Sequence, residues 1–504
     1  MTLETRIKSL FMSSPYPGDL KFGGQPTGLL YALSLLVERK EREYQDRDRV
    51  KQEVEVWCPN GVENVENSQF ENELVKNLRE RKPKIVGIST FSVSYQNAVQ
   101  IKDLVKRISP ETIVVFGGAH IDNSVKYTRQ KGKLDADFEI AGDGMYLLYQ
   151  LYQTIEQNPL ATTDDIKRIV SENAGSFNNL AGAGLLMYEK AEKLVEVKTK
   201  GEPAKLEDTP FIRRYVLKDE DKLSRSFSSL FSGKTIQIIV GQGCPNSCEF
   251  CSEGIKRAWY ADDSPRSRNY LRSLSHLEQE LQHVKAEGYS SIFFDDSTFL
   301  AKPKEYLGKL FNLLKKYGLE WGCQTTIGTV DANRELVARM KESGCSYVYL
   351  GLETFDGELR DSFGSQKYGG VSAESALETL CQEGVRTGVS LTFGHPSHFD
   401  KYETTHETES SVRYTIDKTG QLIEKYPNIC MVSLNLVTYH PGTRYSERYE
   451  EKVLPVEFTA NINNTSPYKS FEEGIGQHPY GMTPELASFI KDYARTKLKD
   501  KVVM

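Results

Sequence analysis

Hydrophobic residues along the chain form two successive series of short apolar runs, separated by amphipathic segments. In residues 1–160 the runs predict five buried strands, at 9–14, 54–58, 85–90, 112–118 and 136–142. The segments between them, such as 27–40 and 95–108, have the periodicity of helices that face a core. Strands that alternate with helices pair in parallel, so this half of the chain predicts an α/β fold with a doubly wound parallel sheet, flavodoxin-like or Rossmann-like.

The second series predicts six strands that also alternate with helices. The strands are expected at 235–241, 291–296, 321–326, 346–354, 388–394 and 430–437, with helices near 271–288, 304–317, 331–343, 371–384 and 409–426. Six such units predict a partial (β/α)6 barrel. Functional side chains are then expected at the carboxyl ends of its strands.

These patterns divide the chain into four regions. Residues 1–160 form the doubly wound domain, 161–234 a less regular linker that ends in a serine-rich connector, and 235–444 the barrel. Residues 445–504 form a tail with a terminal helix, which we expect to enclose a substrate.

Composition narrows the class of protein. The 504 residues, of which 38% are hydrophobic and 27% charged, suit a globular protein of two or three domains. A net charge of -6 argues against a nucleic-acid groove as the main feature. The amino-terminal segment is unlike a secretory signal, and no run approaches the roughly 18 apolar residues of a membrane span. We therefore expect a cytoplasmic location, with cysteines that serve as ligands or buried thiols.

Three of the eight cysteines lie within the stretch GQGCPNSCEFCSEG: Cys244, Cys248 and Cys251. Structural zinc normally has four protein ligands, and the next Cys or His along the chain is His276. A [4Fe-4S] cluster fits better, because three thiolates leave one iron with an open coordination position. A grouping that serves packing alone is the alternative.

The spacing Cys-x3-Cys-x2-Cys, with Phe250 before the third cysteine, resembles the signature of the radical SAM superfamily. The resemblance implies that the open iron binds S-adenosylmethionine (SAM), which is cleaved to a 5′-deoxyadenosyl radical. It also implies SAM contacts at Phe250, at Asp295 and Asp296 after the second barrel strand, and at Glu353 after the fourth. The alternative for these carboxylates is capping of the next helix.

Two later segments resemble the same superfamily with departures. Residues 393–404, FGHPSHFDKYET, occupy the place of a Gly-Leu-Pro-Gly-Glu-Thr segment, with His395 at the apolar position and extra residues after it. The roles of His395 and His398 stay open, and a solvent-facing loop position is the favoured interpretation. YHPGT, at 439–443, resembles a Pro-Gly-Thr turn, and its Tyr439 and His440 could relay protons or simply pack.

The first domain carries PTGLLYA, VGIS-x-F, V-x-GG-x-H and A-G-D-G in order, and with the barrel it is similar to the cobalamin-binding radical SAM family over nearly the whole chain. The resemblance implies that cobalamin binds at the strand ends, near Ser89, Thr90, Gly117, Gly118, His120, Gly142 and Gly144.

The last motif departs from the family pattern, because Asp143 and Met145 replace the two glutamates of Gly-Glu-Gly-Glu. No histidine precedes His120, so an Asp-x-His-x-x-Gly loop that would supply a lower histidine to cobalt is absent. A sheet that has lost the cofactor would show the same absence.

The resemblance implies a methyltransferase that acts on an unactivated carbon, or a phosphorus, of a small molecule. One SAM would methylate the cobalamin and a second would yield the radical, with flavodoxin or ferredoxin as electron donor. A cobalamin-dependent rearrangement, ring contraction or cyclisation is the alternative within the family. A non-enzymatic cobalamin or iron-sulfur binding protein is the alternative outside it. A tRNA methylthiotransferase would need a second cysteine triplet, whereas Cys58 is the one cysteine of the first domain.

Overall fold

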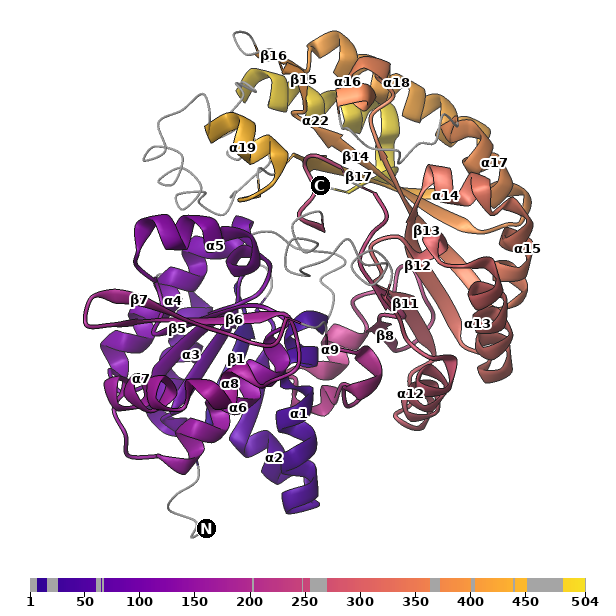
Figure 1. Ribbon diagram of the computed structural model, residues 1–504. Coiled ribbons are helices and arrows are strands. Elements are labelled where there is room, and N and C mark those ends of the chain that lie inside the picture. Colours follow the sequence, from indigo (N-terminus) through magenta and orange to yellow (C-terminus); the bar gives the residue numbers. More distant parts are fainter. Residues whose placement is uncertain are drawn as a thin grey trace.

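A computed structural model describes residues 7–15, 26–59, 65, 68–201, 204–246, 248–253, 270–362, 372–399, 404–437, 440–450 and 484–503. The described part is an α/β structure with two seven-stranded sheets, one in each half of the chain (Figure 1). A search of its helices found none with the length and hydropathy needed to span a membrane.

The first sheet has the strand order β2-β1-β3-β4-β5-β6-β7. Its first five strands are parallel, and β6 and β7 are antiparallel additions at one edge. The five parallel strands are those that the sequence predicts, and the order 2-1-3-4-5 is that of flavodoxin-like sheets. The strands are β1 (Ser9–Ser13), β2 (Val54–Trp57), β3 (Ile85–Ser89), β4 (Ile113–Gly117), β5 (Phe138–Gly142), β6 (Gly184–Lys190) and β7 (Lys193–Lys198).

Helices cover both faces of this sheet. The predicted segment 95–108 is helix α4, which buries Ala98, Ile101, Leu104 and Val105, a spacing that places them on one face. Both sheet faces are covered, so strands such as IVVFG are almost wholly buried. The helices are α1 (Thr27–Tyr44), α2 (Arg47–Glu53), α3 (Gln69–Arg81), α4 (Tyr95–Ile108), α5 (Ala119–Lys131), α6 (Gly144–Gln157), α7 (Thr163–Glu172) and α8 (Ala174–Asn178), with a 3-10 turn η2 (Ser92–Ser94).

The second sheet has the order β18-β17-β14-β13-β12-β11-β8, and all of its pairings are parallel. Its linear order leaves β8 and β18 as edges within the described residues, so the barrel is open, and its six long strands match the six predicted ones. The strands are β8 (Thr235–Ile238), β11 (Ser291–Phe294), β12 (Glu320–Thr326), β13 (Cys345–Glu353), β14 (Arg386–Phe393), β17 (Ile429–Leu436) and β18 (Val502–Val503).

The helices of the second half lie along the outside of the open barrel (Figure 1). They are α12 (Leu274–Ala286), α13 (Lys304–Tyr317), α14 (Ile327–Ala332), α15 (Arg334–Glu342), α16 (Gly357–Ser362), α17 (Ala373–Gln382), α18 (Glu409–Lys425), α19 (Arg444–Glu450) and α22 (Pro484–Leu498), with the turns η5 (Phe299–Ala301) and η7 (Lys499–Lys501). Two short antiparallel strand pairs, β9 (Gly241–Gln242) with β10 (Tyr270–Leu271) and the hairpin of β15 (Pro396–Phe399) with β16 (Thr404–His406), complete this half.

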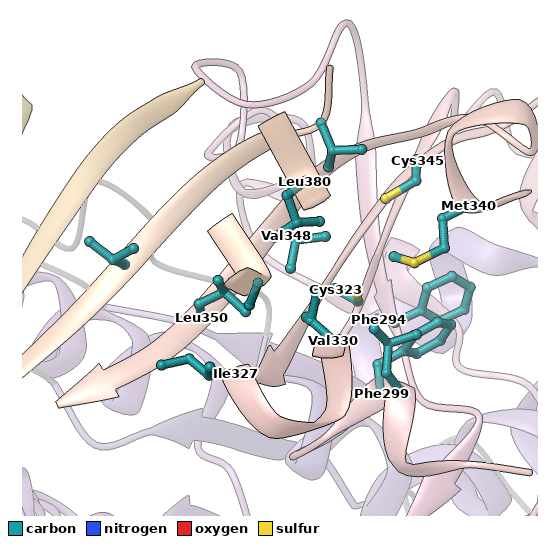
Figure 2. Packing of buried hydrophobic residues seen from close by; sticks show 14 of the residues in the cluster. Phe294, Phe299, Cys323, Ile327, Val330, Met340, Cys345, Val348, Leu350 and Leu380 are labelled. Carbon is teal, nitrogen blue, oxygen red and sulfur yellow. The ribbon is translucent and has the colours of Figure 1, made fainter. Parts of the chain in front are cut away.

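Two cysteines outside the triplet belong to the barrel core. Figure 2 shows Cys323 and Cys345 among Phe294, Met340 and Val348, and both thiols are buried and unpaired. Burial raises the pKa of the Cys345 thiol to about 12. These residues therefore act as small hydrophobic side chains, as the sequence predicts.

The structure changes two of the expected boundaries. The sheet of the first domain continues beyond residue 160, because β6 pairs with β5 along five residues and β7 pairs with β6. Residues 184–198 are thus part of the first domain rather than of a linker. At the other end, β18 pairs with β17 and α22 packs on α18, so the end of the tail completes the barrel sheet.

The segment that joins the domains is tied to both. Leu217 forms a bridge with Val56 at the edge of the first sheet, and the Lys218 N–H donates to the Val56 carbonyl at 2.8 Å. The buried Arg214 guanidinium donates to the Gln237 carbonyl, in the first barrel strand, at 2.5 Å. The 3-10 turns η3 (Leu206–Asp208) and η4 (Arg214–Val216) and helix α9 (Glu220–Ser224) form the rest of this segment.

Candidate active site

The three cysteines lie on one loop after the first barrel strand. We call residues 239–253 the cysteine loop. Cys244 is buried, whereas Cys248 and Cys251 are half-buried, and no disulfide joins any of the three within the described residues. The Cys251 N–H donates to the Cys248 carbonyl at 3.1 Å, so a tight turn holds the last two together.

The thiols face a common region. The pKa of the Cys251 thiol is raised to about 12, chiefly by burial and also by the charges of Cys248 and Cys244. Among the described residues, no three His, Cys, Asp or Glu side chains converge closely enough to hold a single metal ion. A cubane cluster does not require such convergence, because each thiolate binds a different iron. The donor set therefore fits a three-cysteine [4Fe-4S] cluster better than a zinc ion.

Asp296 supports the cysteine loop from the second strand. Its buried carboxylate accepts hydrogen bonds from the Val240 and Gly241 N–H groups, at 3.0 and 2.8 Å, and forms an ion pair with Lys302 at 2.7 Å. Of the two aspartates expected to contact SAM, Asp296 thus uses its carboxylate for contacts within the protein. Asp295 is half-buried, and its N–H donates to the Ile238 carbonyl at 2.9 Å.

A buried ion pair also supports the start of this loop. The Arg272 and Glu280 side chains, each 2% exposed, meet at 2.5 Å, and Arg272 also donates to the Ile239 carbonyl at 3.0 Å. The Cys244 Sγ lies 3.3 Å from the Thr298 hydroxyl. Sequence reasoning missed Arg272 because it reads as one more charged residue before a helix.

Glu353 ends the fourth barrel strand in an unusual backbone conformation. Its φ is 59°, in the left-handed region that side-chain-bearing residues rarely adopt, and the pairing of β13 with β14 shifts register at this point. Its buried carboxylate accepts a short hydrogen bond from the Thr392 hydroxyl. Strained conformations of this kind concentrate at ligand sites, so the geometry supports the expectation of a SAM contact there.

Phe250 lies beside His395 and Tyr445. The Phe250 ring is 5.2 Å from the His395 ring and 6.1 Å from the Tyr445 ring, and the His395 Nδ1 is 3.3 Å from the Tyr445 hydroxyl. His395 is fully buried, so the expectation of a solvent-facing loop was wrong for it. The tail residue Tyr445 fills the space beside this ring. The side chain of His398 and all of Tyr439 lie outside the described residues.

The segment that resembles Gly-Leu-Pro-Gly-Glu-Thr is interrupted by the β15–β16 hairpin. Gly394 precedes the hairpin and Pro396 begins it, whereas Glu407 and Thr408 follow it. The Gly394 N–H donates to the Glu407 carboxyl group at 2.6 Å, and Thr408 caps helix α18. Burial raises the pKa of Glu407 to about 8. Glu407 and Thr408 thus form a second Glu-Thr pair, after the hairpin, which a gapless reading of residues 393–404 misses.

In a flavodoxin-like fold, ligands bind outside the carboxyl ends of the strands where the strand order reverses, which in this sheet is between β1 and β3. We call the residues that follow β1, β3, β4 and β5 the first-sheet edge. The Thr90 N–H and hydroxyl both donate to the Gly117 carbonyl, at 2.7 and 2.9 Å. Gly118 has a φ of 94°, and a Cβ there would lie 2.8 Å from the Thr90 nitrogen. Thr90 and Gly118 thus shape the edge, beside Ser89 at the end of β3.

The A-G-D-G motif at the end of β5 is also held by internal contacts. The Gly142 N–H donates to the Asp122 carboxylate at 2.7 Å, and Gly144 begins helix α6. The Asp143 carboxylate accepts hydrogen bonds from the Ala183 and Ala204 N–H groups, both at 3.0 Å. Asp143 therefore anchors the chain that returns from the β6–β7 hairpin, an interaction that the sequence did not reveal.

His120 lies where the two domains meet. Its ring stacks on Tyr95 at 3.9 Å, and its Nδ1 is 3.1 Å from the Ser92 hydroxyl. The Nδ1 of His440, from the barrel half, lies 3.4 Å from the same hydroxyl. Burial, with the nearby His440, lowers the pKa of His120 to about 3, and burial lowers that of His440 to about 4. Both imidazoles are neutral at physiological pH. Segments that follow β3 in one sheet and β17 in the other thus meet at the Ser92 hydroxyl.

Two family models match the chain in the order of these domains. Residues 60–151 match a B12 binding domain, and residues 238–408 match the radical SAM superfamily. A curated relative, an uncharacterized methyltransferase PH0819 of Pyrococcus horikoshii, is 23% identical over 432 residues, which cover 84% of this chain and 78% of that protein. An anaerobic magnesium-protoporphyrin IX monomethyl ester cyclase of Rubrivivax gelatinosus is 21% identical over 303 residues, 58% of this chain and 48% of that protein.

A solved structure shares the fold. The radical SAM methyltransferase TsrM of Kitasatospora setae, solved with cobalamin and a [4Fe-4S] cluster, aligns with a TM-score of 0.57 over 88% of this chain and 78% of TsrM, at 16% identity. The two domain matches, their order and the cysteine loop agree with this likeness. The chain therefore belongs to the cobalamin-binding radical SAM family.

Proposed function

We propose that the chain is a cobalamin-dependent radical SAM methyltransferase that acts on an unactivated carbon, or a phosphorus, of a small molecule. The observation that carries the proposal is the placement of two strand-end sites against each other. The cysteine loop lies at the carboxyl end of one parallel sheet, and the first-sheet edge, on a B12-binding domain, meets the same half of the molecule through Ser92 and His440.

The residues divide by role. Cys244, Cys248 and Cys251 would hold the [4Fe-4S] cluster, while Asp296 and the Arg272–Glu280 pair fix the loop that carries them. SAM would lie against Phe250, Asp295 and Glu353. Cobalamin would occupy the first-sheet edge, at Ser89, Thr90, Gly117, Gly118, His120, Gly142 and Gly144. When bound, these groups together supply hydrogen-atom abstraction and a transferable methyl group.

The protein's own part in the reaction is positioning. Two cofactors held on separate domains react with one substrate only if the domains hold them at a fixed separation, and well-oriented reactants gain several orders of magnitude in rate. Neutral His120 and His440 place no positive charge near the first-sheet edge. The electron donor is expected to be a flavodoxin or a ferredoxin.

The similarity to the magnesium-protoporphyrin IX monomethyl ester cyclase favours a second candidate function, a cyclisation or rearrangement without methyl transfer. The products formed from SAM separate the two. Anaerobic protein with iron, sulfide, hydroxocobalamin, reductant and SAM should yield S-adenosylhomocysteine, which reports methyl donation, together with 5′-deoxyadenosine, which reports SAM cleavage. Formation of 5′-deoxyadenosine with no S-adenosylhomocysteine above that of a Cys248→Ala control would favour the cyclase. If neither S-adenosylhomocysteine nor 5′-deoxyadenosine formed, a non-enzymatic cobalamin or iron-sulfur binding protein would be favoured.

A further inference from the structure

One short segment of the barrel half contacts both candidate cofactor sites. Residues 440–446 follow β17 and lead into helix α19 of the barrel half. The His440 Nδ1 lies 3.4 Å from the Ser92 hydroxyl of the first-sheet edge. At the other end, the Tyr445 N–H donates to the Glu249 carbonyl of the cysteine loop at 3.3 Å, and Arg444 lies 3.5 Å from the Glu249 carboxylate.

The backbone behind the His440 imidazole is fixed. Its carbonyl accepts hydrogen bonds from the Thr443 N–H at 3.1 Å, the Thr443 hydroxyl at 2.8 Å and the Ser446 hydroxyl at 2.5 Å. Gly442, with a φ of 76°, allows the turn that brings these donors together. A displacement of the His440 backbone would therefore displace the turn and its contact with Glu249.

The partner hydroxyl is equally constrained. Ser92 is buried in the turn η2 and contacts the His120 ring. The His120 backbone N–H donates to the Thr90 carbonyl at 3.1 Å, and the His120 ring stacks on Tyr95. A serine hydroxyl carries a single proton, so it can donate to one of the two Nδ1 atoms only, and the other imidazole must carry its proton on Nδ1 to donate in return. Because the hydroxyl can also accept two hydrogen bonds, at least one of the two neutral rings carries its proton on Nδ1.

We propose that Ser92 and His440 are positioning residues, whose hydrogen bond fixes the separation between the first-sheet edge and the cysteine loop. The inference rests on the proposed function, because this separation matters for chemistry only if both sites carry cofactors. The contact joins residues 348 positions apart, so neither the local chain nor the linker imposes it.

Hydrogen-deuterium exchange of the cofactor-free, full-length chain tests the contact. Ser92→Ala and His440→Leu remove it from opposite domains, whereas His440→Asn keeps a polar atom at the place of Nδ1. Ser171→Ala is the matched control, because it removes a serine contact of 2.8 Å with Tyr188 elsewhere in the first domain. Each of the first two variants should speed exchange about 5- to 30-fold in both 90–94 and 440–446 and in the amides around Glu249. His440→Asn and the control should exchange like wild type.

Faster exchange in the mutated segment alone, or the same pattern in Ser171→Ala, would overturn the proposal. If one variant fails to fold, the other tests the same contact from the opposite domain.

A second readout follows the release of hydroxocobalamin from the holoprotein. The double variant Ser92→Ala with His440→Leu should release hydroxocobalamin no faster than either single variant, because each substitution removes the same contact. Multiplicative acceleration would contradict a shared role. Wild-type protein that retains no corrinoid would refute the proposed function, while the exchange experiment would still decide the contact.

Discussion

The imidazoles of His120 and His440 come from opposite domains and share one hydroxyl, that of Ser92, at 3.1 and 3.4 Å. His120 is fully enclosed against Tyr95, and His440 is half-buried at the start of the turn that reaches the cysteine loop. Both rings are neutral at physiological pH because burial lowers the pKa of each imidazole. This arrangement makes the meeting of the two domains sensitive to protonation.

The interdomain contact should weaken in acid. We call the structure with the Ser92–His440 contact the closed state and the structure without it the open state. In the closed state the pKa of His120 is lowered to about 3 and that of His440 to about 4, from an ordinary value of about 6.5, although Asp135 partly opposes the shift at His120. The contact is therefore at full strength above about pH 6.5 and is lost as pH falls toward the closed values, because the open state binds protons that the closed state excludes. Release of hydroxocobalamin should accelerate by up to about tenfold per pH unit for each histidine. His440→Asn should halve the slope, and equal slopes would contradict this account.

The two adjacent aspartates should behave differently. Asp296→Asn places an amide nitrogen against a backbone N–H and removes the charge that pairs with Lys302, so it should destabilise the cysteine loop by about 3 kcal/mol and lower the iron content after reconstitution. Asp295→Asn should retain the iron and weaken SAM binding. Iron quantitation and a SAM titration on both variants check this, and a normal iron content in Asp296→Asn would show that its contacts are dispensable.

Glu353 should contribute to SAM binding through its carboxylate. Glu353→Gln should weaken SAM about tenfold or more, as expected for loss of a charged hydrogen-bond acceptor. Glu353→Gly is the control for the backbone, since glycine adopts the observed φ of 59° without strain. It should fold at least as well as Glu353→Gln and bind SAM as weakly. Unchanged affinity in both variants would move the SAM site elsewhere.

Gly118 should not tolerate a side chain. Gly118→Ala forces a Cβ to within 2.8 Å of Thr90 backbone atoms at a φ of 94°, so it should cost at least about 2 kcal/mol and reduce corrinoid retention. Gly28→Ala, at a helical position with no atom within 4 Å of the added Cβ, should be neutral or slightly stabilising. Urea unfolding of the two variants makes the comparison. Equal stability would mean that the edge adapts to the added methyl group.

Breaking the buried ion pair should affect the cysteine loop. Arg272→Met leaves the Glu280 carboxylate buried without its partner, which typically costs about 3–5 kcal/mol, whereas Arg272→Met with Glu280→Leu should recover most of the loss. Thermal unfolding and iron content of the single and double variants test this. A double variant as unstable as the single one would indicate that the hydrogen bond from Arg272 to the Ile239 carbonyl, rather than the pair, is what matters.

The sequence predicted the strands and helices well where apolar periodicity was strong. All eleven predicted strands are present, because parallel strands buried on both faces leave continuous apolar runs. The boundaries were less predictable. Strands β6 and β7 lie in a segment of mixed charge, and the pairing of β18 with β17 depends on chain ends that only the tertiary structure brings together.

The site was predicted to a similar degree. The cysteine spacing, Asp295 and Glu353 follow from local motifs, and their roles stay predictions. Ser92, Arg272, Thr392 and Glu407 carry no local signal, because their importance comes from partners 8 to 348 positions away or from a hairpin inserted before Glu407. His395 was misjudged for the same reason, since the ring that covers it belongs to Tyr445.

The most direct test of the central claim is the cofactor content of the reconstituted protein. The chain is loaded anaerobically with iron, sulfide and hydroxocobalamin, desalted, and read by iron quantitation and by the corrinoid absorption spectrum. We predict about four irons and about one corrinoid per chain, with the iron lost in Cys248→Ala. About four irons with no retained corrinoid would contradict a cobalamin-dependent function, and the methyltransferase proposal would then fail.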